Sequence, residues 1–249
     1  MTSPDPALPE PSLPAPTNRT GSSSALRRAL SSAFGLFVFT LVFTSLMAFT
    51  HKVTSGRIEA AEIRHKMLLI GEVLSNLDYD NALLDDVIEA RDSGESRVGK
   101  VWRARNGGAP VALVFETSAP DGYGGSIKLI VSLDNGGRIG GVRVASQKET
   151  PGLGDYIDPA KDRMKDNPWI SQFNGVDAVA PATLWEVKKD GGNFDYWNVK
   201  KDGGNFDYRA GATVSARAVT RAVGRAAAWV DARREALFDA PVEKQKDKQ

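Results

Sequence analysis

The strongest feature of the hydropathy pattern is an uncharged apolar run near the amino end of the chain. It extends from Ala29 to Phe49 and reads ALSSAFGLFVFTLVFTSLMAF. At a rise of 1.5 Å per residue, a helix of this length spans about 30 Å, the thickness of a bilayer's hydrocarbon core. Its hydroxyl residues fit this pattern, because Ser and Thr in a helix can bond back to a preceding carbonyl. We therefore predict one transmembrane helix over residues 25–51, and no other stretch is long enough to span.

A cleaved signal peptide is the alternative interpretation of this run. Arg27 and Arg28 precede it and small residues lie near its end, as in secretory signals. The run is longer than the usual apolar core of a signal, which favours an anchor. Basic residues stand on both sides of the run: Arg19, Arg27, Arg28, Lys52 and Arg57. We expect the amino terminus to lie inside the cell.

Beyond the run, apolar residues recur at helical spacing through a charged segment. They are Ile58, Ala61, Met67, Leu68, Leu74 and Leu77. This spacing indicates a helix leaving the membrane. A second short helix is expected over residues 81–90, NALLDDVIEA, so that residues 52–97 form a helical connector.

The pattern changes to strands at Val98. Short runs follow that are β-branched or alternate between apolar and polar residues: KVWRAR, APVALVFETS and SIKLIVSLD. The sequences NGG, DGYGG and DNGGRIGG separate them, as expected for glycine turns between strands. A helical pattern returns from Thr213 to about Phe238, with an apolar stripe made of Val214, Ala218, Val219, Ala222, Val223, Ala226, Ala227 and Val230. Helices on both sides of a strand-rich middle predict an α+β domain over residues 98–238.

Both ends of the chain have the composition of disordered tails. Residues 1–24 are rich in Pro, Ser and Thr, and residues 239–249 end in VEKQKDKQ. Such segments bury too little apolar surface to offset the entropy of ordering. One perfect repeat, VKKDGGNFDY, begins at Val187 and again at Val199. It is too short for a solenoid unit, so we interpret it as a tandem duplication that lengthens a hairpin or loop.

Charge and composition exclude several classes of function. A formal charge of +1 provides no positive field for phosphate backbones, so no nucleic-acid binding is expected. The chain has no cysteine, which excludes iron–sulfur clusters, disulfides and thiolate zinc sites. His51 and His65 are too few for a histidine-based metal site, and we predict no metal and no catalytic residue. Any redox chemistry therefore needs an organic cofactor.

Other chemical candidates have simpler interpretations. Asp85, Asp86 and Glu89 could suggest a metal site, but charges on one helical face are usually solvated. Four tryptophans could stack on an aromatic cofactor or fill the core: Trp102, Trp169, Trp185 and Trp197.

The most informative motif is DYRAGAT, Asp207 to Thr213, at the start of the last predicted helix. Gly211 and Ala212 leave room for a large group to approach the backbone. The free amides and positive dipole end of a helix favour an anion, so Thr213 offers a hydroxyl where a phosphate would be stabilised. Alternatively, Thr213 or Ser215 simply caps the helix.

A second motif, KETPGLGD, covers residues 148–155 and follows a GYGGSIKL stretch at residues 122–129. Its Pro and Gly content is typical of a rigid, tight loop, with Leu153 as its one large apolar side chain. Such a loop could cover one face of an isoalloxazine ring and meet its polar edge with backbone groups. It could equally be an inert turn.

Together these motifs resemble those of FMN-binding domains in the G subunit of Rnf-type complexes and the C subunit of sodium-translocating NADH:quinone reductases. The resemblance extends over most of residues 25–235, and KETPGLGD with GYGG is closer to the Rnf type. It implies a twisted, mainly antiparallel sheet flanked by helices. In that family a flavin transferase moves FMN from FAD onto the last threonine of the motif, here Thr213, as a phosphoester. Asp207 matches the acidic residue recognised by the transferase, whereas Ala210 departs from the usual Ser or Thr.

The resemblance implies which residues surround the flavin. Around the attachment site these are Gly211, Ala212 and Ser215, and in the second motif they are Glu149, Thr150, Leu153 and Gly154. The first copy of the repeat has no GAT after it, so we expect no second flavin.

The implied function is that of an electron relay in a membrane complex coupled to sodium or proton movement, a ferredoxin:NAD oxidoreductase. The chain would be single-pass in the bacterial cytoplasmic membrane, with the FMN domain on the periplasmic side and the complex's other proteins as partners. The alternative is an anchored, non-redox module that binds a phosphate-bearing ligand or assembles its neighbours.

Overall fold

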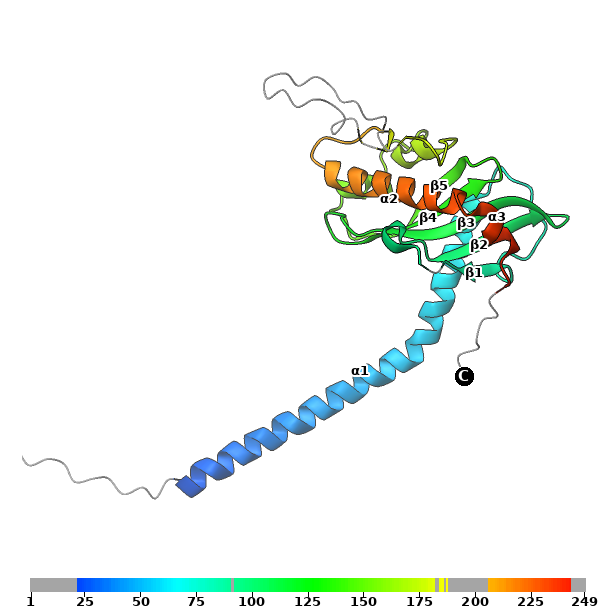
Figure 1. Cartoon of the computed structure of the whole chain (residues 1–249). Helices are drawn as coiled ribbons and strands as arrows, with labels where there is room; N and C mark the ends of the chain where they lie inside the picture. Colours follow the sequence, from blue (N-terminus) through cyan, green and yellow to red (C-terminus); the bar gives the residue numbers. More distant parts are fainter. Residues whose placement is uncertain (1–21, 91, 182–183, 186, 188–205, 243–249) are drawn as a thin grey trace, which may run out of the picture. The chain divides into compact units, whose positions relative to one another are not determined.

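The computed structural model describes residues 22–90, 92–181, 184–185, 187 and 206–242. Contacts divide the chain into two compact units, Met1–Ala60 and Ala61–Gln249. One continuous helix, α1 (Ser22–Val73), contributes residues to both units (Figure 1). The predicted span and the first part of the predicted connector therefore belong to a single helix.

Between Leu26 and Ala60 the helix α1 carries large apolar side chains that contact little other protein. Phe34, Leu36 and Met47 are 69%, 68% and 76% exposed. The Thr40 and Thr50 hydroxyls each donate to the carbonyl four residues earlier, at 2.8 Å. Apolar side chains without protein neighbours suit a lipid environment, so this part of α1 fits a single-pass membrane anchor.

The second unit contains a five-stranded antiparallel sheet in which the strands follow one another in chain order. The strands are β1 (Val87–Glu89), β2 (Lys100–Asn106), β3 (Ala109–Ala119), β4 (Ile127–Asp134) and β5 (Ile139–Ser146). The predicted runs KVWRAR, APVALVFETS and SIKLIVSLD form β2, β3 and β4, which confirms the α+β class. Short 3-10 helices occur at η1 (Gly94–Ser96), η2 (Gly154–Ile157) and η3 (Trp169–Phe173).

Glycines make the tight turns between these strands. Gly107 and Gly108 join β2 to β3, and both have positive φ angles, of 57° and 83°. That conformation suits a two-residue hairpin turn whose twist matches that of the strands. Asp134 closes the turn before β5 by accepting from the backbone amides of Gly136 and Arg138, at 2.8 and 2.9 Å.

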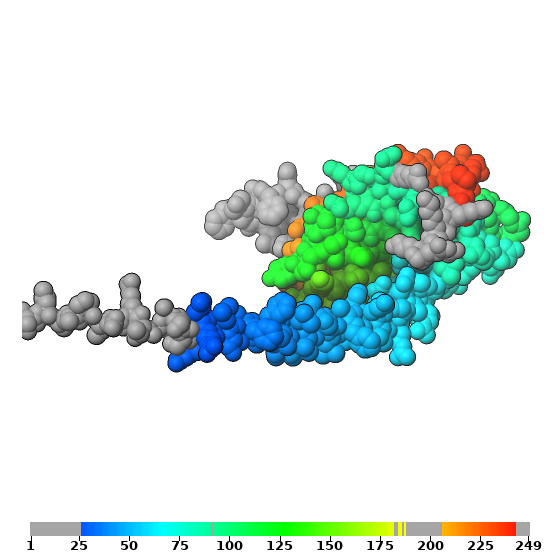
Figure 2. Space-filling model, turned by 90° about the horizontal axis from the view of Figure 1, so that it is seen from below, coloured from blue at the N-terminus to red at the C-terminus, as the bar shows by residue number. Residues whose placement is uncertain are grey.

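The two faces of the sheet pack against different helices. On one face, Leu113, Phe115 and Val131 join the core beneath α2 (Thr213–Asp231) and α3 (Arg234–Asp239). On the other face, Trp102, Val114 and Ile130 pack with Leu69, Ile70 and Val73 at the end of α1. Figures 1 and 2 show this cyan end of α1 beside the green strands.

The end of α1 approaches the sheet very closely. The Ser132 hydroxyl donates to the Val73 carbonyl at 2.6 Å, which satisfies one acceptor of the last helical turn. A Cβ at Gly141 of β5 would lie 3.2 Å from the Val73 Cα. Two adjacent glycines in β5 thus make room for the helix, and β5 itself has no clear strand pattern in the sequence.

The short helix predicted over residues 81–90 is wrong. Residues 87–89 form β1, whose Ile88 pairs with Val101 of β2. Asp86, which was expected to be solvated, instead pairs with Arg103 and Arg105. The apolar positions in this stretch fit either period, and pairing with β2 selects the strand.

The last predicted helix is divided into two. α2 ends at Asp231 and α3 begins at Arg234. The predicted apolar stripe of α2 is buried except for Val214, which is 42% exposed in the first turn. The repeat prediction falls mostly on residues 188–205, outside the described residues.

Candidate functional site

Thr213 is the first residue of α2, and Ala212 is the residue that caps the helix. Ala212 has no side-chain oxygen, and no side-chain hydrogen bond caps this end. The amides of the first helical turn are therefore not satisfied by a cap. The capping alternative for Thr213 is wrong, because Thr213 lies inside the helix, and Ser215 is occupied elsewhere.

The side chain of Thr213 is largely buried at the start of α2. The residue is 9% exposed, and its hydroxyl makes no hydrogen bond within the part of the chain that the structure describes. Gly211, two positions earlier, has a φ angle of 84°. A Cβ built on Gly211 would meet no atom within 4 Å, so open space lies beside this turn.

The loop before Thr213 is held by residues far away in the sequence. The buried carboxylate of Asp162 pairs with the Arg209 guanidinium and accepts from the Trp169 amide at 2.7 Å. The Arg209 guanidinium also lies over the ring of Tyr156, 4.9 Å from its centre. The Tyr156 hydroxyl donates to the Ala212 carbonyl and accepts from the Arg209 amide, both at 3.3 Å.

Tyr156 is 3% exposed, and this burial has an electrostatic consequence. Burial raises the pKa of the Tyr156 phenol above its usual 10.0, and the nearby Arg209 offsets part of this rise. The phenol therefore stays protonated and can keep donating to Ala212.

At its other end, the loop is fixed through Asp207. The Trp169 indole N–H donates to the Asp207 carbonyl, and the Asp207 amide donates to the Gln172 side chain at 2.7 Å. Residues of η2 and η3 thus hold both ends of DYRAGAT.

The buried carboxylate of Glu149 joins three separate segments. It accepts a hydrogen bond from the Ser215 hydroxyl on α2 and another, at 3.0 Å, from the Gly124 amide in the GYGG turn. Glu149 is 4% exposed. The two sequence motifs and the start of α2 therefore meet at one carboxylate.

Close packing around Glu149 explains the second glycine of PGLG. A Cβ on Gly154 would lie 2.6 Å from the Ser215 hydroxyl oxygen and 2.8 Å from a Glu149 carboxylate oxygen. Any larger residue would push the loop away from α2. Gly152, by contrast, is needed for its φ angle of 77° in the turn that closes when the Leu153 and Gly154 amides donate to the Thr150 carbonyl.

Exposed apolar side chains surround this meeting point. Tyr123 is 75% exposed beside Gly124, Leu153 is 53% exposed beside Gly154, and Val214 is 42% exposed beside Ser215. Thr150 is also exposed. The structure thus brings Glu149, Gly154 and Ser215 into direct contact, and it leaves Thr150 and Leu153 on the outer side of the same loop.

Several residues of this site had no local signal in the sequence. Tyr156, Asp162 and Trp169 act on the attachment loop from 38 to 56 positions away. The sequence indicates only that the two motifs belong to one site; it does not indicate which other residues hold that site together. Trp102, Trp169 and Trp185 are buried, which supports the core interpretation for them, and Trp197 lies outside the described residues.

Comparison with known proteins identifies the type of domain. A family model described as the FMN-binding domain matches residues 122–228, from the GYGG turn through most of α2. A second model, the RnfG N-terminal region, matches residues 24–73, which is nearly all of α1. The chain is therefore an FMN-binding-domain protein with an apolar amino-terminal helix.

The relatives make the assignment more specific. The G subunit of an ion-translocating oxidoreductase complex from Pseudomonas aeruginosa (strain UCBPP-PA14) is 41% identical over 220 residues, covering 86% of this chain and 95% of that protein. Proteins of the same name from Vibrio cholerae (strain M66-2) and Shewanella loihica are 36% and 35% identical, covering 83% and 86% of this chain and 92% and 95% of their own lengths. The chain belongs to the family of G subunits of ion-translocating oxidoreductase complexes.

Proposed function

We propose that this protein is the electron-relay subunit of a membrane-bound, ion-translocating oxidoreductase of the Rnf type, with FMN esterified through its phosphate to Thr213. The observation that carries this proposal is the position of Thr213. Its hydroxyl lacks a partner among the described residues, at the uncapped amino end of an FMN-binding domain's last long helix.

The residues present suit a phosphate at this position. The first-turn amides of α2 and the positive end of its dipole stabilise an anion. Ala212 brings no side-chain acceptor that would compete for those amides, and the space beside Gly211 admits a bulky group. Tyr156 and Asp162 keep the loop in this conformation through Ala212 and Arg209.

The remainder of the cofactor would lie against the loops joined by Glu149. Leu153 and Tyr123 offer exposed apolar and aromatic surface on the loops that meet at that carboxylate. Thr150 supplies an exposed hydroxyl on the same loop, and Gly154 lets that loop pack against Ser215. Glu149 itself positions these loops relative to α2, because it holds Ser215 and Gly124 at once.

When bound, FMN supplies the ability to accept and release electrons singly. The chain's own part is to retain the group, orient it and anchor it to the membrane. Attachment through a covalent bond prevents loss from an exposed domain. No side chain is required to act as an acid or a base, so the oxidoreductase activity belongs to the assembly.

Attachment requires a second enzyme. We propose that a flavin transferase cleaves the pyrophosphate of FAD, joins the FMN phosphorus to the Thr213 oxygen, and releases AMP and the hydroxyl proton.

The FMN-binding domain stands on the periplasmic side of the cytoplasmic membrane. There it exchanges electrons with other proteins of the assembly, in a complex that transfers electrons between ferredoxin and NAD and moves sodium ions or protons.

Removing the Thr213 hydroxyl tests whether Thr213 is the attachment residue. The full chain is coexpressed with a flavin transferase, and covalent flavin is detected by ultraviolet fluorescence after denaturing electrophoresis and by intact mass. Thr213→Val removes the hydroxyl but keeps the shape, so the fluorescent band and the added mass should both disappear. The wild-type protein should show one flavin per chain.

Thr220→Val is the matched control. Thr220 lies seven residues later on the same helix, and its buried hydroxyl also lacks a partner within the described chain. This variant should remain fluorescent. A fluorescent Thr213→Val protein would mean that the attachment residue is wrong. A wild-type protein without flavin under these conditions would favour the non-redox, phosphate-binding or assembly module.

A further inference from the structure

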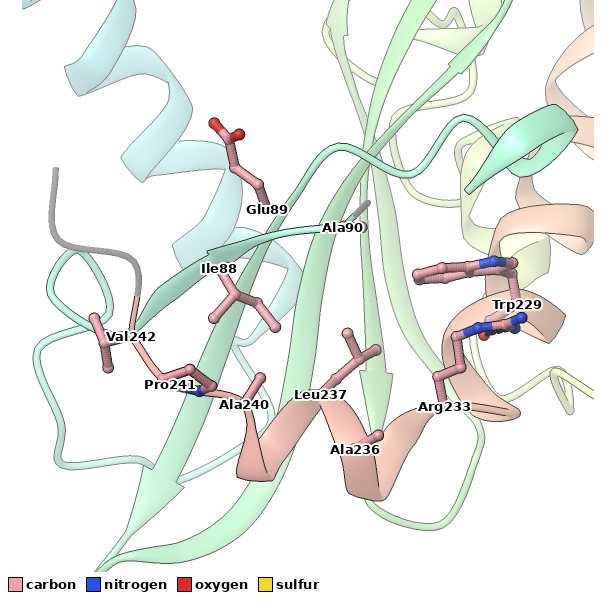
Figure 3. A pocket seen from close by; sticks show the side chains of 10 residues that line it. All are labelled: Ile88, Glu89, Ala90, Trp229, Arg233, Ala236, Leu237, Ala240, Pro241 and Val242. Carbon is pink, nitrogen blue, oxygen red and sulfur yellow. Dashed lines mark hydrogen bonds between the residues drawn. The ribbon is translucent and has the colours of Figure 1, made fainter. Parts of the chain in front are cut away.

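A hollow of about 710 Å³ lies between β1 and the carboxyl-terminal helices, away from the Thr213 site. Figure 3 shows Ile88 and Leu237 pointing into it from opposite sides, with Trp229 and Arg233 at one end and Pro241 and Val242 at the other. The lining residues are apolar except for Arg233 and for Glu89, whose side chain points away from the hollow in Figure 3. Such a groove can receive apolar side chains from outside the domain.

The strand beside this groove has an open edge. β1 is the first strand of the sheet, and among the residues that the structure describes it pairs only with β2. The Ala90 amide donates to the Gly99 carbonyl and the Arg103 amide donates to the Asp86 carbonyl, at 2.9 and 3.0 Å. Because backbone groups alternate in direction along a strand, Val87 and Glu89 direct their N–H and C=O groups away from β2.

No backbone partner meets Val87 or Glu89 on that outer side within the described chain. Two donors and two acceptors are therefore free to bond an added strand. Its alternate side chains would enter the groove beside Ile88, because Ile88 faces the groove and its neighbours Val87 and Glu89 face the other way.

The residues that follow the groove in the sequence offer it no suitable occupant. The seven residues after Val242 read EKQKDKQ and contain no apolar side chain. A second copy pairing through β1 would present Ile88 to the groove, but that side chain is only 6% exposed and already packed in its own core. The occupant must bring apolar side chains of its own.

We propose that this groove and the open edge of β1 bind an extended segment of another protein of the complex by β-strand addition. The segment carries apolar residues at alternate positions. It also has an acidic residue that reaches Arg233, whose guanidinium lies 4.5 Å from the centre of the Trp229 ring and donates to the Trp229 carbonyl at 3.3 Å. Backbone bonds provide the affinity and the groove selects the side chains. The proposal rests on the chain being a member of such a complex.

Site-specific photo-crosslinking in the intact membrane complex tests this proposal. Glu89→p-benzoylphenylalanine places the probe at the exposed edge, and Asp121→p-benzoylphenylalanine, on the exposed turn after β3, is the matched control. We expect a crosslink from position 89 to an alternating apolar segment of a different protein of the complex. A crosslink to a second copy, a crosslink to the chain's own residues 243–249, or a yield no higher than the control would overturn the proposal.

Filling the groove gives an independent test. Ala236 is exposed and lines the hollow, so Ala236→Trp occupies it without disturbing the core. Ala232→Trp is the matched control, because Ala232, in the turn between α2 and α3, is exposed and outside the lining. Ala236→Trp should lower the crosslink yield from position 89 by about tenfold, a change of about 1.4 kcal/mol, and Ala232→Trp should not. Equal yields would contradict the proposal. In-gel flavin fluorescence should be unchanged in both, which separates this result from failure of the proposed cofactor site.

Discussion

Among single residues, Tyr156 links the electrostatics of the site to the stability of the domain. Burial raises the pKa of its phenol above the usual 10.0. In the unfolded chain the phenol loses its proton near that ordinary value, whereas in the folded chain it loses it at a higher pH. Unfolding is therefore favoured as the pH rises through this range, and the stability supplied by the neutral phenol is fully present only below it.

The raised pKa of Tyr156 predicts a specific pH dependence of the domain's stability. The free energy of unfolding should fall as the pH rises above about 9, and Tyr156→Phe should lose less over the same interval. Below that range the variant should be less stable by about 1 kcal/mol, because the Ala212 carbonyl and the Arg209 amide lose a partner. The measurement is denaturant unfolding of the full chain, followed by tryptophan fluorescence.

Tyr123→Phe is the control, because Tyr123 is 75% exposed. Its pH dependence should equal that of the wild-type protein. A Tyr156→Phe variant with the wild-type dependence would show that another group is responsible.

A residue of the site could be predicted from the sequence only where it belongs to a continuous motif. DYRAGAT indicated the start of α2, and Thr213 is the first residue of that helix. The pairing of Glu149 with Ser215 joins positions 66 apart, and no periodicity indicates it. Tyr156 and Asp162 were missed for the same reason, since each acts on a loop that only the tertiary fold brings near.

At the scale of elements, α2 depends on a glycine where it crosses Trp185. A Cβ on Gly224 would lie 2.5 Å from two carbons of the buried indole, which stacks with Phe206 at 5.5 Å between ring centres. Gly71 of α1 lies in a helix too, but a Cβ there would meet nothing within 4 Å. The two glycines share a backbone conformation and differ in their surroundings.

The same substitution should therefore have opposite effects at these two positions. Gly71→Ala should raise the free energy of unfolding by about 0.5–1 kcal/mol, because alanine restricts the unfolded chain and favours helix. Gly224→Ala should lower it by about 1–3 kcal/mol, because the clash outweighs that gain. Thermal or denaturant unfolding measures both. Stabilisation by Gly224→Ala would show that the indole can move aside at little cost.

Elements were predictable where length and pattern were unambiguous. The apolar run gave α1, and glycine turns separated β2, β3 and β4. β1 was mistaken for a helix, because its apolar residues fit both periods and only pairing with β2 decides between them. β5 lacked a strand signal, because Gly140 and Gly141 occupy positions where the end of α1 leaves no room for side chains.

Across the whole molecule, two arginines join the start of the sheet to the last helix. Arg103 is buried, pairs with Asp86, and donates to the carbonyls of Leu237, Phe238 and Ala240, 134 to 137 positions away. Arg105 donates to the Phe238 carbonyl at 2.6 Å and lies over the Phe238 ring. These bonds satisfy carbonyls at the end of α3, which a helix leaves unpaired.

Removing this link should release α3 while the site at Thr213 stays intact. Arg103→Met leaves several carbonyls and part of the Asp86 charge without a donor, so the free energy of unfolding should fall by about 3 kcal/mol. Amide hydrogen exchange should increase over residues 234–240, whereas α2 residues near Thr213 should keep their protection.

Arg138→Met, at an exposed arginine, is the control. It should change the free energy of unfolding by no more than about 0.5 kcal/mol and leave the exchange over residues 234–240 unchanged. Because Leu237 and Ala240 form one wall of the groove beside β1, Arg103→Met should also reduce crosslinking from position 89. Unchanged exchange over residues 234–240 would mean that apolar packing alone holds α3 in place.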